Sequence, residues 1–81
     1  MMKKSDRSNV YELYLRDLGV IVKEMAFAAA ADHRQYNDEF RAGYLSGFHR
    51  IVSLMQQQTI GFNIPLDKIG LDGIDSDVDL I

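Results

Sequence analysis

Residues 40–50, FRAGYLSGFHR, decide how this chain is expected to fold. Their apolar residues recur at the spacing of an α-helix, yet Gly43 and Gly47 lie among them. A glycine inside a helix costs roughly 1 kcal/mol relative to alanine, so two glycines need a structural reason. Three reasons are considered: close packing of two water-exposed helices, a helix contact of the membrane type, and close approach of a ligand to the backbone. The polar residues around the glycines favour the first.

The first helix is predicted over about residues 9–33, because Asn9 followed by Glu12 resembles a capping box. At 100° per residue, one broad face of this helix is apolar and is expected to form the core. That face consists of Tyr11, Tyr14, Leu15, Leu18, Ile21, Val22, Met25 and Ala29. A second apolar stripe lies on nearly the opposite side, and either the C-terminal segment or another chain should cover it. The stripe consists of Leu13, Val20 and Phe27.

A turn is predicted over residues 33–38, HRQYND, because this run lacks apolar periodicity and because Asn37 and Asp38 are typical turn and N-cap residues. One uninterrupted long helix is the alternative. The second helix should then cover about residues 38–60, with Gly61 as its C-terminal cap. The predicted core face of the second helix consists of Phe40, Tyr44, Phe48, Ile51, Val52, Leu54 and Met55. The apolar faces of the two helices predict an antiparallel hairpin.

The chain divides into three predicted segments. Residues 1–8 form a flexible basic arm, residues 9–60 form the helical hairpin, and residues 61–81 form a short helical turn and an acidic tail packed on the hairpin. Within the last segment, Pro65 should begin a helical turn over residues 65–69. The expected anchors of the tail are Ile74, Val78, Leu80 and Ile81.

Centring the turn near Tyr36 pairs Ala29 with Gly43 and Met25 with Gly47. The alanine-rich run AFAAAA then faces the two glycines, so the helix axes should approach closely near the turn. Large residues at the other end should hold the helices apart. Gly43, Gly47, Ala29 and Met25 are therefore the expected helix-packing residues.

A chain of 81 residues is near the size at which a single core barely holds a fold. Disulfides are excluded because the chain has no cysteine, and His33 and His49 are too few for a histidine-built zinc site. Self-association is the remaining means of stabilising so small a core. The expected fold is all-α, an antiparallel two-helix hairpin with a short third helical turn and a tail, paired as a homodimer into a four-helix arrangement.

Composition argues against two classes of partner. The net charge is −3, and Lys3, Lys4 and Arg7 are the only clustered basic residues, so nucleic-acid binding is not expected. No apolar run approaches the ~18 residues of a membrane span, and the N-terminus lacks the apolar region of a signal peptide. A soluble cytoplasmic protein is expected.

The C-terminal tail carries the densest charge. Alternating Asp75, Asp77 and Asp79 resemble the first ligands of a calcium loop, but the glycine and glutamate that such a loop needs are missing. No metal or other cofactor is therefore predicted. The tail also suggests an alternative function, an acidic inhibitor or immunity-type protein that masks a basic partner such as a nuclease. Its contact residues would be Asp72, Asp75, Asp77 and Asp79.

The helices contain no pattern that predicts catalysis. His49 has a serine one turn away, but no nucleophile turn and no orienting acid accompany the pair, so His49 is expected to be a surface residue. An enzyme would need a polar pocket near His49. Gln58 should point into the core or an interface, whereas Gln56 and Gln57 should point away.

The favoured function is non-catalytic. The apolar surface that remains after the hairpin closes predicts a homodimeric regulatory or adaptor module that also binds an unidentified protein. The stripe of Leu13, Val20 and Phe27 is its expected contact surface.

Overall fold

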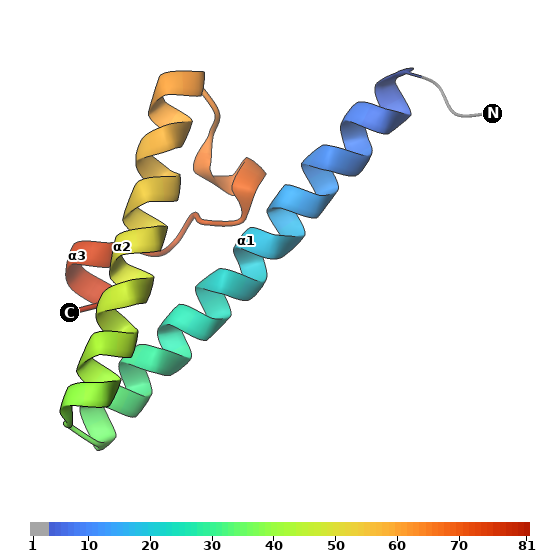
Figure 1. The fold of residues 1–81 in the computed structure, drawn as a ribbon. Helices are drawn as coiled ribbons and strands as arrows, with labels where there is room; N and C mark the ends of the chain where they lie inside the picture. The colour runs from blue at the N-terminus through green and yellow to red at the C-terminus, as the bar shows by residue number, and fades with distance from the viewer. Residues whose placement is uncertain (1–3) are drawn as a thin grey trace.

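The computed structural model describes residues 4–81, with side chains from residue 9 onward, and it is all-helical over that range (Figure 1). Helix α1 (Lys4–Gln35) and helix α2 (Glu39–Phe62) pack as an antiparallel pair. The 3-10 helix η1 (Leu66–Ile69) and the short helix α3 (Ser76–Asp79) follow. The prediction of an all-α helical hairpin is confirmed.

Both long helices extend beyond their predicted ends. Helix α1 begins at Lys4 because no glycine or proline precedes Asn9 to stop the helix; residues 1–3 of the predicted arm lie outside the described residues. Helix α2 passes Gly61 and ends at Phe62, with Asn63 as the cap at a φ of 59°. Asparagine, like glycine, tolerates this left-handed conformation, so it takes the place predicted for Gly61.

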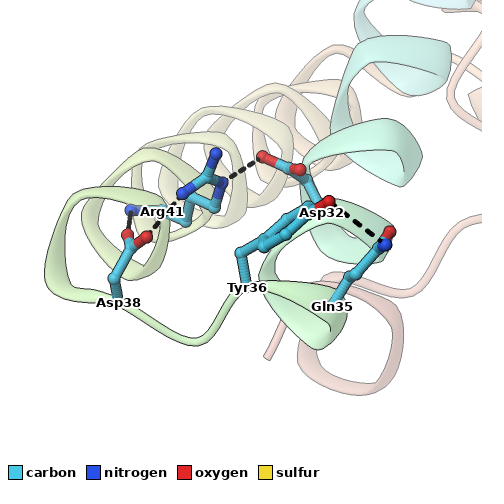
Figure 2. Close-up of polar contacts among 5 residues, drawn as sticks. All are labelled: Asp32, Gln35, Tyr36, Asp38 and Arg41. Carbon is cyan, nitrogen blue, oxygen red and sulfur yellow. Dashed lines mark hydrogen bonds and ion pairs between the residues drawn. The ribbon is translucent and has the colours of Figure 1, made fainter.

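The turn between the helices is held by Arg41 (Figure 2). Its backbone N–H donates to the Asp38 carboxylate at 2.8 Å, which caps the start of α2. Its guanidinium donates to Asp32 of α1 at 2.7 Å and also to Asp38, and it lies 4.7 Å from the centre of the Tyr36 ring. One side chain therefore joins the last turn of α1 to the first turn of α2.

Replacing Asp38 tests this cap. The backbone N–H of Arg41 holds the pKa of Asp38 below its ordinary value of 3.8. A lowered folded-state pKa means that the contribution to stability is present above about pH 3.8 and is lost as the pH falls further. Asp38→Ala should lower the melting temperature at pH 7, and the difference from the wild type should shrink at pH 3. Circular dichroism melts at both pH values measure this.

Asp38→Asn keeps a capping oxygen without a titrating charge, so its melting temperature should fall less at pH 7. An equal deficit for Asp38→Ala at pH 7 and pH 3 would contradict the argument.

The C-terminal segment fills the space between the two diverging helices. Figure 1 shows the helices separating away from the turn, with η1 between them and the following chain crossing α2 to reach α3. A Cβ atom on Gly19 would overlap the carbonyl group of Ile69, 2.7 Å from its carbon. A Cβ atom on Gly70, whose φ is 72°, would lie 2.6 Å from the backbone nitrogen of Val20. The backbones of α1 and η1 are thus in direct contact, which only glycine permits at these two positions.

The core is small and includes the C-terminal segment. The largest fully buried side chains are Leu71, Leu80 and Val52. Among residues 9–81, nine hydrophobic residues are buried: Ala26, Ala29, Ala30, Leu45, Val52, Ile69, Leu71, Ile74 and Leu80. Since four of the nine lie between residues 69 and 80, this segment forms part of the core itself. Of the four expected tail anchors, Ile74 and Leu80 are buried, whereas Val78 and Ile81 are exposed.

Candidate interaction surface

Each long helix is rotated relative to its prediction, so only part of the predicted apolar face is buried. On α2 the buried residues are Leu45, Val52 and Thr59. Of the residues predicted for the α2 core, Val52 is buried and Phe48 packs against the core, while Met55 is half-buried. The other four are 48–79% exposed; they are Phe40, Tyr44, Ile51 and Leu54. On α1 the buried residues are Gly19, Ala26, Ala29 and Ala30. Neighbouring residues predicted for the core are 39–66% exposed; they are Tyr14, Leu18, Ile21 and Met25.

The reason for this rotation is the backbone contact at Gly19. Residues 69–70 approach α1 where its surface is smallest, so the core forms around Gly19 and the alanines. The bulkier residues of α1 then lie to one side of this contact. A helical wheel shows which faces are apolar, but it does not show which of them the rest of the chain covers.

The two uncovered apolar faces lie on the same side of the hairpin. With residues placed at 100° intervals around the axis of α1, three sectors follow one another as the angle increases. The first sector holds the exposed apolar residues, and the second holds the core residues. The third contacts the C-terminal segment through Arg16, Gly19 and Lys23. Around α2 the order is the same, with the C-terminal segment contacted through Ser53 and Gln56. In an antiparallel pair the same order on both helices places both exposed faces opposite the C-terminal segment. We call this surface the hairpin face: Tyr14, Leu18, Ile21 and Met25 of α1, with Phe40, Tyr44, Ile51 and Leu54 of α2.

Gly43 and Gly47 belong to this side of the molecule. Both are exposed, and a Cβ atom on either would meet nothing within 4 Å. The prediction that they pack against Met25 and Ala29 of the same chain is therefore wrong. Ala29 is buried in the core, while Met25 is nearly half exposed on the hairpin face. The glycines that make the close contact are Gly19 and Gly70.

The predicted contact stripe of α1 is also exposed, but on another side of the helix. Leu13, Val20 and Phe27 are 37–57% exposed. Val20 lies at the border of the η1 contact, because its side chain would meet a Cβ atom on Gly70. The structure thus separates two apolar surfaces of α1, the stripe and the hairpin face, and only the hairpin face continues onto α2.

The molecule exposes more surface than a compact chain of its size. A folded monomer of 9.2 kDa is expected to expose about 4,900 Å², whereas this chain exposes 6102 Å². The radius of gyration is 14.9 Å, compared with about 12 Å for a compact domain of this length. The principal extents of 52 × 25 × 17 Å describe a long, thin layer.

The four carboxylates of the acidic tail all make contacts within the chain. Asp75 accepts from the backbone N–H of Asp77 and caps α3, and Asp79 accepts from the backbone N–H of Asp75. The Oδ1 atom of Asp77 lies 3.0 Å from Nε2 of His49, and the Oδ1 atom of Asp72 lies 3.8 Å from Nζ of Lys23. Each of these carboxylates therefore has a local contact within the chain.

His49 borders a shallow cleft of about 770 Å³ between α2 and the C-terminal segment, and both polar and apolar residues line it. Its Nε2 atom contacts Asp77, which is 85% exposed, while the Ser53 hydroxyl lies 2.6 Å from the Ser76 hydroxyl. The serine and the histidine thus have separate partners, so these contacts do not form a nucleophile and base pair. They hold α3 against α2.

Gln56 is the glutamine that sequence reasoning misplaced. Its amide donates to the carbonyl oxygens of Leu71 and Ile74 at 3.0 and 2.9 Å, so it ties the C-terminal segment to α2. Gln58, predicted to point inward, is exposed. The same rotation of α2 that exposes the hairpin face exchanges the positions of these two residues.

No helix within residues 4–81 is long and apolar enough to cross a membrane. In the same range, no group of three or more histidine, aspartate or glutamate side chains is placed to hold a metal ion. No protein-family model, curated protein or solved structure matches this chain.

Proposed function

We propose that this protein is a small, non-catalytic interaction module that acts as a homodimer, with the hairpin faces of two chains packed against each other. The observation that carries the proposal is the continuity of the hairpin face. By their helical positions, exposed apolar residues of α1 and α2 lie on the same side of the hairpin, opposite the C-terminal segment, and no part of the described chain covers them. Two such layers would form the four-helix arrangement expected from the sequence.

The exposed area supports a second copy as the occupant. The excess over a compact monomer is about 1,200 Å², and a standard interface removes about 800 Å² from each partner. Residues 9–81 of a single chain bury nine hydrophobic side chains, a small core to which pairing of two hairpin faces would add further buried area. A twofold contact between identical faces is the commonest closed solution.

Gly43 and Gly47 give a second line of support. Each carries the propensity cost of a helical glycine, and neither makes a close contact within its own chain. Gly47 lies between Tyr44 and Ile51 on the hairpin face. A neighbouring helix from a second chain can approach the backbone there, which offsets that cost.

The decisive experiment compares the two exposed surfaces. Ile51 on the hairpin face and Phe27 on the stripe are similarly exposed, at 48% and 40%. Since twofold symmetry places Ile51 in the interface twice, Ile51→Glu should raise the dimer dissociation constant by about 100-fold or more. Phe27→Glu should leave it unchanged. Sedimentation velocity over a concentration series measures both. Dissociation by Phe27→Glu alone would assign the dimer contact to the stripe and overturn the proposed face.

The adaptor part of the proposal concerns the stripe. Leu13, Val20 and Phe27 lie on a different side of α1 from the hairpin face, so a homodimer leaves them accessible to a second, different protein. The cytoplasm, the location expected from the sequence, remains part of the same proposal.

A further inference from the structure

The borders of the hairpin face carry opposite charges on the two helices. On α1, Asp17 and Glu24 lie four residues before and three residues after Ile21, so they flank its exposed side. On α2, Arg50 lies three residues after Gly47 and four before Leu54. All three are exposed, and within the described part of the chain Glu24 and Arg50 take part in no ion pair. The border of α1 is acidic, and that of α2 is basic at Arg50.

Glu24 and Arg50 also lie at the same level along the hairpin. Glu24 precedes the end of α1 at Gln35 by 11 residues, and Arg50 follows the start of α2 at Glu39 by 11 residues. At a rise of 1.5 Å per residue, each is about 16 Å from the turn. Within one chain they lie on outer borders of separate helices, so equal height does not bring them together.

Two twofold arrangements are open to a face-to-face dimer. If the axis runs parallel to the helices, α1 of each chain lies on α2 of the other, and heights along the hairpin are preserved. If the axis runs across the helices, α1 lies on α1 and α2 on α2, and residues near mid-height approach their own copies. The first arrangement brings Glu24 to Arg50 of the other chain, whereas the second brings like charges together.

We propose that the second copy docks with α1 of each chain on α2 of the other, which gives two Glu24–Arg50 pairs at the borders of the interface. This inference rests on the proposed homodimer and specifies its orientation. The small residues agree with it. Gly47 lies eight residues after Glu39, and the exposed Ala28 lies seven residues before Gln35, so in this arrangement Gly47 of one chain lies at nearly the same level as Ala28 of the other.

A charge exchange tests the orientation. Glu24→Arg and Arg50→Glu should each raise the dimer dissociation constant, by roughly tenfold at low ionic strength, because each places two like-charged contacts at the border. The double variant restores opposite charges and should return the constant to within about threefold of the wild type. Arg34→Glu changes the net charge by the same amount as Arg50→Glu but lies on the opposite side of α1, so it should have no such effect.

The outcomes separate this inference from the proposal on which it rests. A wild-type chain that stays monomeric would refute the homodimer itself. A dimer in which the single variants are neutral, or in which the double variant is weaker than both singles, would refute the α1-on-α2 orientation and leave the homodimer standing. Recovery in the double variant alone establishes the pairing.

Discussion

Gly19→Ala is expected to lower the free energy of unfolding by about 3 kcal/mol, because the added methyl group has no space against η1. A Cβ atom at this position overlaps the Ile69 carbonyl, which belongs to the backbone and has no rotamer to change. Relief requires η1 to move away from α1. That movement would also separate Gly70 from Arg16 and Val20 and would disturb the burial of Ile69.

The matched control is Gly43→Ala in α2. A Cβ atom there meets nothing within 4 Å, so the substitution should stabilise the single chain by about 0.5–1 kcal/mol through helix propensity. Urea denaturation followed by circular dichroism, at chain concentrations below the dimer dissociation constant, measures both variants on the single chain. If Gly19→Ala unfolds at the same urea concentration as the wild type, the backbone contact between α1 and η1 does not hold the fold together.

Leu71→Ala is expected to cost about 2–5 kcal/mol, the range for removing a fully buried leucine side chain. Leu71 has no exposed surface, and its carbonyl oxygen accepts from Gln56, so it fixes the crossing of the C-terminal segment. Small domains have limited total stability, so this variant should unfold at much lower urea concentration or be unfolded without denaturant.

Ile81→Ala is the control for Leu71→Ala. Ile81 lies in the same tail but is 77% exposed, so its truncation should change the free energy of unfolding by less than about 0.5 kcal/mol. Equal small losses for both variants would show that the tail does not belong to the core. A large loss for Leu71→Ala alone supports the account of a core shared between the hairpin and residues 69–80.

Sequence patterns were sufficient to predict the class of fold. Period-3.6 apolar spacing and the capping residue Asp38 predicted two helices and the turn between them, because these features depend on local interactions. The observed start of α1 at Lys4 and the observed cap of α2 at Asn63 differ from the predicted start at residue 9 and the predicted cap at Gly61. Helix ends depend on small differences among neighbouring residues.

Apolar spacing alone could not predict which face of each helix is buried. Each helix has more apolar surface than one neighbour covers, and the choice between faces is made by a long-range contact of Gly19 with Ile69 and Gly70. The sequence contained one sign of this contact, a glycine in the middle of α1. Gly43 and Gly47 have a more familiar spacing for helix packing, yet they make no close contact within the chain. Gln56 and Gln58 differ from their predicted positions because the same long-range contact decides which face of α2 is buried.

The central claim is that the hairpin face is covered by a second copy of the chain, and sedimentation equilibrium of the wild-type protein tests it most directly. The account predicts a mass that rises with concentration to twice the chain mass of 9.2 kDa, about 18.4 kDa. A mass that stays at 9.2 kDa across the micromolar range would contradict it.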